Sequence, residues 1–266
     1  MISDPNDFKD VPAPPDGPPA PPPTGRVVEM FSTLQGEGLH VGQRQLFIRL
    51  AGCSWRCRYC DTPDSLTHEG HETLTVHQVL HRVRELQATR DHAVVTLTGG
   101  EPLLQSDFLA ALLPSLKELG LRTYLETSAT HPNLFRPLAP WCDVIAADIK
   151  LPSAIGRPFW AEHEEFLRIA GDRAFVKIVL TAQTTEDEME TAVNLLSRLT
   201  PVPPLVLQPV TPIADLDVRF QDPGSAAPMQ ILPPPPARLV GFWDWARQRI
   251  PVVKLIPQMH PAWGLP

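Results

Sequence analysis

The chain has 266 residues, of which 43% are hydrophobic, and its formal net charge is −7. A chain of this length can bury one large core or two small ones, and its negative charge argues against nucleic-acid binding through a general basic surface. The N-terminus is polar and acidic, unlike a signal peptide, and no apolar run approaches the roughly 20 residues that span a bilayer. We therefore expect a soluble, cytoplasmic protein that binds neither nucleic acid nor membrane.

Residues 1–25 are rich in proline, which lacks an amide donor and favours extended polyproline II conformation. This composition predicts a disordered or semi-rigid leader, with a folded domain over residues 26–266. A PxxP ligand for a partner domain is the alternative, but composition alone favours the plain leader.

Beyond the leader, apolar stretches alternate between the periods of strands and helices. Strands are predicted at 26–33, 45–52, 93–97, 122–126, 143–148, 175–180, 204–210 and 251–256, and helices at 75–88, 106–120, 184–199 and around 237–249. This alternation is typical of a parallel α/β sheet or barrel. The proline-rich segment 209–236 is too long for a plain connector, so we expect it to be functional or disordered.

The helix boundaries carry local signals. Ser106 is a candidate N-cap for the second predicted helix and Gly120 a stop, while Pro114 should kink or split it. Thr185 and Glu188 have the spacing of a capping box at the start of the third helix.

Three of the four cysteines lie within GCSWRCRYCDT, at positions 53, 57 and 60, and Cys142 lies far downstream. Cysteines this close in a chain without a secretion signal indicate a metal site in a reducing compartment. A zinc site would need a fourth ligand, which a histidine could supply, and an electron-carrier cluster would need a fourth cysteine. The third alternative is a 4Fe–4S cluster with one iron left open for another ligand. Cys142 is expected to be a small buried residue.

The C-x₃-C-x₂-C spacing, the aromatic Tyr59 before the last cysteine and LTGGEP at 97–102 together resemble the radical S-adenosylmethionine superfamily. The resemblance implies a partial, open TIM-like barrel of mainly parallel strands with outer helices. It also implies a 4Fe–4S cluster whose open iron binds S-adenosylmethionine, which is then split to a radical that abstracts hydrogen. The glycines would let the backbone approach the methionine end of this cofactor, and Glu101 would help to set the turn.

Within that superfamily, the stretch from EMFSTLQGEG to FIRLAGC resembles the 7-carboxy-7-deazaguanine synthases, as do Asp61-Thr62, ETSAT at 126–130, LQPV at 207–210 and the pair Gln258 and His260. The resemblance implies conversion of 6-carboxy-5,6,7,8-tetrahydropterin to 7-carboxy-7-deazaguanine with loss of ammonia, in queuosine or 7-deazapurine biosynthesis. It further implies Mg²⁺ as a cofactor, flavodoxin or ferredoxin as the electron donor, and a homodimer.

Site residues are implied by the same resemblance. It assigns Leu34, Gln35, Gly36, Arg49, Thr98 and the carboxylate of Pro266 to the pterin, Cys53, Cys57 and Cys60 to the cluster, Thr62 to Mg²⁺, and Tyr59, Cys60, Asp61, Gly100, Glu101, Glu126, Ser128, Lys150 and Gln208 to S-adenosylmethionine. A guanidinium fork suits the substrate carboxylate, and a hydroxyl oxygen suits a hard cation. Two positions depart from the family pattern: Asp148-Ile149-Lys150 replaces S-P-K, and Ala129 replaces a glycine.

Several alternatives accompany this assignment. A histidine cluster (His68, His71, His77 and His81) has no acidic third ligand, so we expect solvated side chains. A glycyl-radical activase would share the cysteine loop but would not require QGEG or Arg49. A zinc-binding or electron-transfer module would be distinguished by its iron, sulfide and zinc content.

Overall fold

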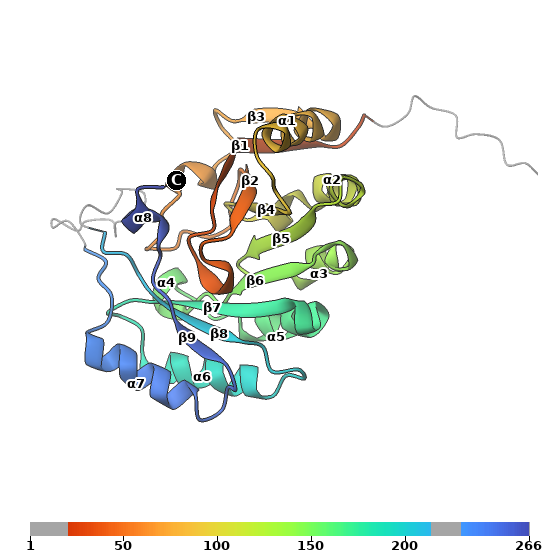
Figure 1. Cartoon of the computed structure of the whole chain (residues 1–266). Helices are drawn as coiled ribbons and strands as arrows, with labels where there is room; N and C mark the ends of the chain where they lie inside the picture. Colours follow the sequence, from red (N-terminus) through yellow and green to blue (C-terminus); the bar gives the residue numbers. More distant parts are fainter. Residues whose placement is uncertain (1–20, 214–229, 266) are drawn as a thin grey trace, which may run out of the picture.

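The structure is a computed structural model that describes residues 21–213 and 230–265 (Figure 1). The described strands form one nine-stranded sheet in the order β3-β1-β2-β4-β5-β6-β7-β8-β9. Their bounds are β1 (Thr24–Leu34), β2 (Arg44–Leu50), β3 (Glu72–Thr75), β4 (Val94–Gly99), β5 (Arg122–Thr127), β6 (Val144–Asp148), β7 (Ala174–Leu180), β8 (Leu205–Pro209) and β9 (Val253–Leu255). Strands β2 and β4 to β9 run parallel, whereas β1 is antiparallel to β2 and β3.

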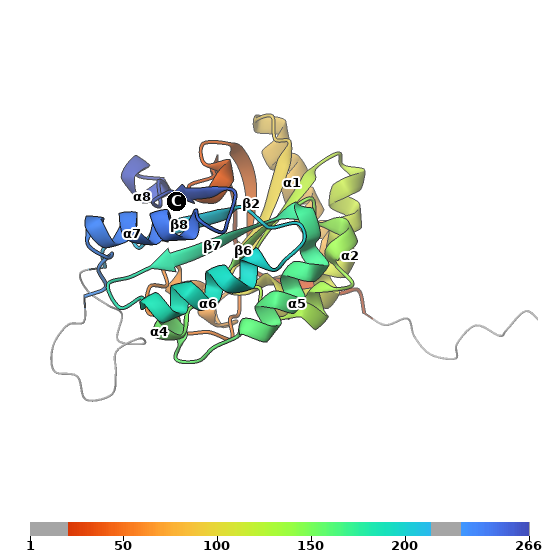
Figure 2. The ribbon, with the colours of Figure 1, turned by 90° about the horizontal axis from the view of Figure 1, so that it is seen from below.

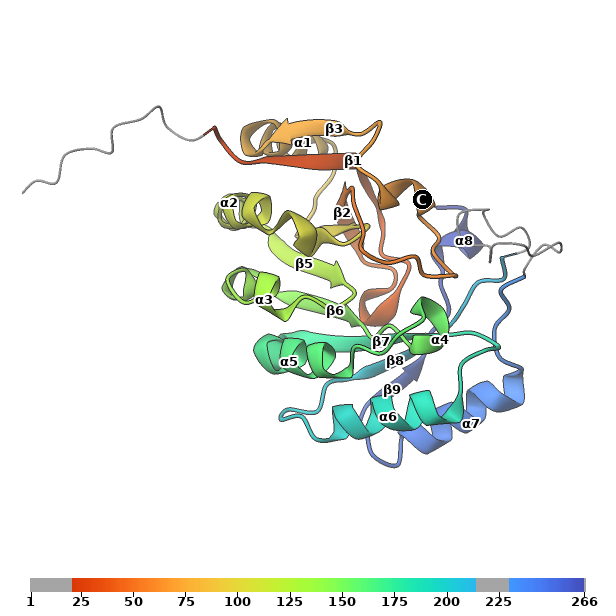
Figure 3. The same cartoon turned by 180° about the vertical axis from the view of Figure 1, so that it is seen from behind.

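The helices follow the strands in the chain. Their bounds are α1 (Val76–Thr89), α2 (Ser106–Glu118), α3 (Pro132–Phe135), α4 (Pro152–Ile155), α5 (Trp160–Ala170), α6 (Glu186–Ser197), α7 (Pro236–Ala246) and α8 (His260–Trp263), with short 3₁₀ turns η1 (Gly38–His40), η2 (Pro63–Leu66), η3 (Pro102–Gln105), η4 (Ala139–Trp141) and η5 (Gly171–Arg173). Helices α1, α2, α3, α5 and α6 lie along the outer side of the curved sheet (Figures 1 and 3). Figure 2 shows the same layering from below.

The two edges of the sheet are β3 and β9, so the barrel is open rather than closed. This confirms the predicted partial barrel of mainly parallel strands with outer helices. The antiparallel β1 and the short β3 extend the sheet beyond the parallel strands; the sequence signals did not predict β3.

The main hydrophobic core lies between the sheet and the outer helices. Side chains alternate across a strand, and β7 shows the consequence: Val176, Ile178 and Leu180 join this core, whereas Phe175, Lys177 and Val179 face a cavity on the inner side. A strand buried on both faces reads as one apolar run, which is why β7 was recognisable from its sequence.

The boundaries of α2 correct two predictions. Ser106 already has helical dihedrals, so it is not the N-cap; that place falls to Gln105, because η3 runs directly into the helix. The helix is unbroken through Pro114, so the predicted split is wrong. The carbonyl four residues earlier loses its usual partner, but Ala110 is exposed and water can replace it. Gly120 stops the helix as predicted, with φ +76° and its N–H donating to the carbonyl of Lys117 at 2.9 Å.

Other local predictions fare differently. The capping box of Thr185 and Glu188 is confirmed at the start of α6. Helix α5 was missed, because the buried His163 interrupts its apolar stripe and hides the helical period.

Of the proline-rich segment, residues 214–229 lie outside the described part, and Ile213 and Ile231 pair through an isolated antiparallel bridge. In the described part of the chain, no helix combines the length and apolarity needed to cross a membrane.

Candidate active site

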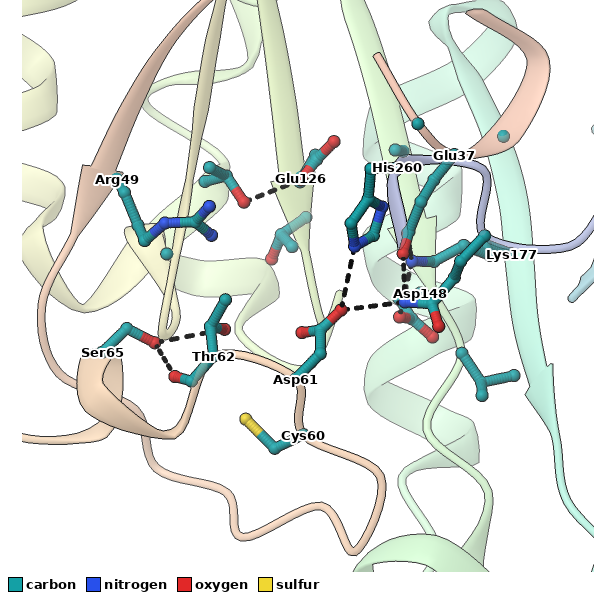
Figure 4. A pocket seen from close by; sticks show the side chains of 18 of the residues that line it. Glu37, Arg49, Cys60, Asp61, Thr62, Ser65, Glu126, Asp148, Lys177 and His260 are labelled. Atoms are coloured by element: carbon teal, nitrogen blue, oxygen red, sulfur yellow. Dashed lines mark hydrogen bonds and ion pairs between the residues drawn. The ribbon is translucent and has the colours of Figure 1, made fainter. Parts of the chain in front are cut away.

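A cavity of about 440 Å³ opens at the carboxyl ends of the parallel strands, the usual place for a site in an α/β barrel. Every site residue predicted in the described part of the chain lines it, except Glu101. Pro266, predicted to contact the pterin, lies outside the described residues. Figure 4 shows side chains from both ends of this cavity, with Arg49 and Glu126 on one side and Glu37, Lys177 and His260 on the other.

The cysteine loop follows β2 and forms one wall of the cavity. Cys53, Cys57 and Cys60 all line it, and the backbone N–H of Trp55 donates to the Sγ of Cys53 at 3.4 Å. Burial raises the pKa of the Cys57 thiol to about 12. Bound iron would be needed to hold these sulfurs as thiolates.

The three thiols suit an iron–sulfur cluster, because cysteine thiolates are the ligands that hold such clusters. Among the described residues, no group of three His, Cys, Asp or Glu side chains is arranged to hold a single metal ion. Two buried atoms, Asp148 Oδ1 and Gln208 Oε1, have no hydrogen-bond partner among the described residues, and both side chains line the cavity. Since buried polar atoms are normally paired, they fit a polar ligand such as S-adenosylmethionine.

The glycines of LTGGEP are needed for packing beside the cysteine loop. A Cβ on Gly99, whose φ is +135°, would lie 2.0 Å from the carbonyl oxygen of Leu50, and one on Gly100 would lie 2.3 Å from that of Gly52. The structure thus gives these glycines a reason other than close approach to the cofactor: β4 ends against the base of the cysteine loop. Gly100 also lines the cavity.

Glu101 lies behind the cavity wall rather than in it. Its buried carboxylate accepts hydrogen bonds from the backbone N–H groups of Leu103 (3.1 Å) and Ser128 (2.8 Å) and from the hydroxyls of Thr127 (2.8 Å) and Ser128. Ser128 in turn lines the cavity. Glu101 therefore holds the turn that presents Ser128.

At the other end, polar side chains surround Glu126. Its carboxylate accepts hydrogen bonds from Gln35 Nε2 (2.9 Å) and from the Thr98 hydroxyl (2.7 Å), and burial raises its pKa. Glu126 was predicted for the cofactor, but it contacts two residues predicted for the pterin. Arg49 lines the same cavity, with its Nε donating to Glu29 at 2.8 Å.

A group of largely buried charges links β6, β7 and the QGEG loop, and it was largely missed by the sequence predictions. Lys177 pairs with Glu37 and lies 3.4 Å from Asp148, which also pairs with Lys150 at 2.9 Å. Burial alone would raise the pKa of Glu37, but the charge of Lys177 and the hydrogen bonds from Lys177 and Gln258 together outweigh it and lower that pKa to about 2. Lys177 was missed because it lies within an apolar strand and matches no motif. A single lysine in a strand does not by itself indicate a functional site.

The C-terminal segment returns to the cavity and contacts the QGEG loop and the residue after the last cysteine. Gln258 Nε2 donates to Glu37 (2.7 Å) and to Asp61 (2.8 Å), and the Met259 N–H donates to the carbonyl of Gly36 at 2.9 Å. A Cβ on Gly36 would lie 2.7 Å from the His260 side chain, so glycine leaves room for this segment.

The histidine cluster and Cys142, for which no function was predicted, have ordinary structural surroundings. His81 pairs with Glu85 on the exposed face of α1, 3.5 Å away, and Cys142 is buried in the main core. Both findings agree with the predictions.

An open parallel barrel that carries three thiols of a C-x₃-C-x₂-C loop at its strand ends defines a radical S-adenosylmethionine enzyme, and the Radical SAM superfamily model matches residues 47–196. A 7-carboxy-7-deazaguanine synthase of Geobacter sulfurreducens is 33% identical over 262 residues, which cover 91% of this chain and 98% of that protein. A synthase of the same name from Methanopyrus kandleri is 35% identical over 212 residues, covering 72% of this chain and 83% of the relative. The chain belongs to the 7-carboxy-7-deazaguanine synthase family.

The fold is also similar to solved structures. A crystal structure of QueE from Escherichia coli is 24% identical, covers 71% of this chain and 85% of its own, and has a TM-score of 0.54. A radical SAM methyltransferase from Sphaerobacter thermophilus gives a TM-score of 0.56 at 17% identity, covering 89% of this chain and 77% of its own. Both likenesses support the fold.

Proposed function

We propose that this protein is a 7-carboxy-7-deazaguanine synthase, which converts 6-carboxy-5,6,7,8-tetrahydropterin to 7-carboxy-7-deazaguanine with loss of ammonia. The observation that carries the proposal is that one cavity holds three thiols at one side and, at another, Arg49 beside the Glu126 group. The cluster and S-adenosylmethionine would supply the radical that takes hydrogen from the substrate. A glycyl-radical activase, which acts on a protein, would have no use for the small-molecule half of this cavity.

The chain's own residues would bind the substrate and orient it. Arg49 has its Nε held by Glu29, so its two terminal nitrogens remain for the substrate carboxylate. Gln35, Thr98 and Glu126 form a hydrogen-bonded group that suits the donor and acceptor edges of a pterin. We accordingly place Glu126 at the pterin rather than at the cofactor ribose.

Cys53, Cys57 and Cys60 would hold the cluster, and Asp148 and Gln208 each offer an unpartnered oxygen to S-adenosylmethionine. The other residues assigned to that cofactor are Tyr59, Asp61, Gly100, Ser128 and Lys150, which line the cavity. Glu101 would act through Ser128, whose hydroxyl and backbone N–H it fixes.

Mg²⁺ is proposed to bind at Thr62. This residue lines the cavity directly after the cysteine loop, and the Ser65 hydroxyl lies 3.5 Å from its Oγ1. Such a cation would keep several waters in its coordination shell. We further propose a flavodoxin or ferredoxin as electron donor, a homodimer, a cytoplasmic location, a leader over residues 1–25 and a catalytic domain over residues 26–266.

The test is an anaerobic assay of the reconstituted protein with the tetrahydropterin, S-adenosylmethionine, Mg²⁺ and dithionite. Product is identified by its mass and absorbance, and ammonia and 5′-deoxyadenosine are measured alongside. We expect product in the parent and none in Cys57→Ala, while Cys142→Ala keeps cluster and activity. Protein with full iron and sulfide that cleaves S-adenosylmethionine but leaves the pterin unchanged would contradict the proposal.

A further inference from the structure

The side chain of Trp55 connects the cysteine loop with the turn after β5, and the sequence predictions gave it no role. Trp55 lies two residues after Cys53 and lines the cavity. Its indole Nε1 donates to the hydroxyl oxygens of Thr130 (3.1 Å) and Ser128 (3.3 Å). The indole N–H therefore joins two segments that lie more than 70 positions apart in the chain, with separations of 73 and 75.

The direction of each hydrogen bond in this turn follows from the groups at its two ends. The carboxylate of Glu101 can only accept, so the Ser128 hydroxyl donates to it. The Ser128 and Thr130 hydroxyls lie 2.8 Å apart, and because the Ser128 proton is already used, Thr130 is the donor of this pair. An indole N–H can only donate, so Thr130 Oγ1 accepts from it. The bonds therefore run one way, from the indole of Trp55 to the carboxylate of Glu101.

This chain of hydrogen bonds determines what the Ser128 hydroxyl can offer to a ligand in the cavity. Its proton is held by Glu101, so toward the cavity its oxygen can act only as an acceptor. Ser128 and Thr130 are both buried, and successive hydrogen bonds in such surroundings strengthen one another. Loss of the indole N–H would leave Thr130 Oγ1 without its donor and would let the hydroxyls of the turn reorient.

The indole ring is fixed by its neighbours on the outer side of the loop. It packs edge-on against Phe159, with ring centroids 4.4 Å apart, and lies nearly parallel to the ring of His131 at 6.1 Å. The Arg157 guanidinium lies over the same indole, 5.2 Å from its centroid. A ring with neighbours at its face and its edge cannot turn its N–H away without losing these contacts.

We propose that Trp55 is a positioning residue for S-adenosylmethionine, which acts through Ser128 and couples the cofactor-binding turn to the cluster loop. The inference rests on the proposed assignment of Ser128 to this cofactor. The main chain of Trp55 contacts the cluster ligand Cys53, because its N–H donates to the Sγ at 3.4 Å. One rigid residue thus sets the first thiol relative to the turn, and the cofactor would meet both in a single arrangement.

The test uses Trp55→Phe, which keeps an aromatic ring in place but removes the N–H. Binding of S-adenosylmethionine to the full-length, cluster-loaded protein is measured by equilibrium dialysis without the pterin. We expect the dissociation constant to rise about fivefold or more, because a buried hydroxyl loses its donor. The Michaelis constant for the pterin should change by less than about twofold and the iron content per chain should stay the same, since neither depends on this hydrogen bond.

The matched control is Trp243→Phe, which removes an indole N–H of the same kind far from the cavity. Trp243 lies in α7, packs against the main core and donates through Nε1 to the carbonyl of Val253 at 3.3 Å. This control should bind S-adenosylmethionine as the parent does.

A second variant, Thr130→Val, breaks the same chain of hydrogen bonds one residue further along. If Trp55 acts through Thr130, the change Trp55→Phe should weaken cofactor binding less in the Thr130→Val background than in the parent. Equal losses in the two backgrounds would overturn the coupling.

Electron paramagnetic resonance of the reduced cluster gives a readout that a purely structural role would not move. Without S-adenosylmethionine, the spectrum of Trp55→Phe should match that of the parent, and the spectral change on adding the cofactor should need about fivefold more of it. Parent-like affinity in Trp55→Phe with full iron, or an equal loss in Trp243→Phe, would overturn the proposal. Because cofactor binding is measured without the pterin, a parent that binds S-adenosylmethionine but makes no deazaguanine would contradict the proposed function alone.

Discussion

Arg49 is placed for recognition by the pairing of β1 with β2. It lies directly opposite Glu29 in the antiparallel register, and its Nε donates to that carboxylate at 2.8 Å. A side chain held at Nε presents its two terminal nitrogens in a fixed direction. Lysine cannot reproduce this arrangement, because its ammonium is a single point charge on a flexible stem.

We therefore expect Arg49→Lys to raise the Michaelis constant for the pterin about tenfold or more, since hydrogen bonds to charged groups contribute roughly 1.5–3 kcal/mol. Release of 5′-deoxyadenosine without product should persist, because the cofactor half of the cavity is unchanged. Steady-state kinetics with both products measured checks this. A Michaelis constant equal to that of the parent would remove Arg49 from the substrate site.

Glu101 offers a second prediction at the scale of one residue. In Glu101→Gln, one carboxylate oxygen becomes an amide group that cannot accept from Ser128 or Thr127. Losing a buried, charge-assisted acceptor should lower the free energy of unfolding by about 2 kcal/mol. It should also weaken S-adenosylmethionine binding, because Ser128 is no longer fixed. Denaturant unfolding and cofactor titration measure the two effects, and a variant as stable as the parent would show that Glu101 is dispensable.

At the scale of an element, the conformation of the turn after β5 limits which residues can occupy position 129. Ala129 has φ +54°, a left-handed conformation that costs an ordinary residue roughly 1–2 kcal/mol. Its methyl group is fully buried, and this burial stabilises the folded state by about 0.8 kcal/mol. A glycine would relieve the strain but would lose this burial and cost about 0.5–1 kcal/mol in chain entropy. The two residues are therefore nearly equivalent here.

We expect Ala129→Gly to change stability by less than about 1 kcal/mol, whereas Ala129→Val should cost more than about 2 kcal/mol, because a branched side chain at positive φ is a true outlier. Thermal or denaturant unfolding distinguishes the two. Equal stability of the valine variant and the parent would mean that the turn can adopt another conformation.

The sequence predicted strands better than short helices. Parallel strands are continuous apolar runs, and α1, α6 and α7 have regular stripes, so these elements were recognisable. Helix α5 was not, because His163 interrupts its apolar stripe, and the four-residue helices were not, because they are too short to show a helical period. Within the site, the cysteines and QGEG were recognisable as local motifs. Lys177 was not, since its role depends on Glu37, which lies 140 residues away.

At the scale of the whole molecule, the C-terminal segment completes the cavity. Leu265 lines it, and Gln258 ties the segment to Glu37 and Asp61. We expect removal of residues 264–266, or a C-terminal tag, to reduce turnover severalfold while iron content is unchanged. Activity assays beside iron and sulfide analysis check this, and a tagged protein with parent turnover would contradict it.

The buried charges predict a dependence of stability on pH. The pKa of Glu37 falls from 4.5 to about 2 on folding, so its contribution is present above pH 4.5 and lost as the pH drops toward 2. The pKa of Glu126 is raised, so its contribution has the opposite sign and is lost as the pH rises. Glu37→Gln should lose on the order of 2–3 kcal/mol at pH 7 and show a flatter stability curve between pH 5 and 2. A variant curve parallel to that of the parent would rule out the ionised pair.

The contacts that close the cavity also determine when it can form. The hydrogen bond from Gln258 to Glu37 joins residues 221 positions apart, and that to Asp61 spans 197. Loop closure on this scale is slow, and contacts of long sequence separation form late in folding. During synthesis the cysteine loop therefore emerges long before the segment that covers it. The nascent protein passes through a stage in which its thiols are open to solvent and oxidant, and only a cluster that is loaded after the last strand has folded is spared that exposure.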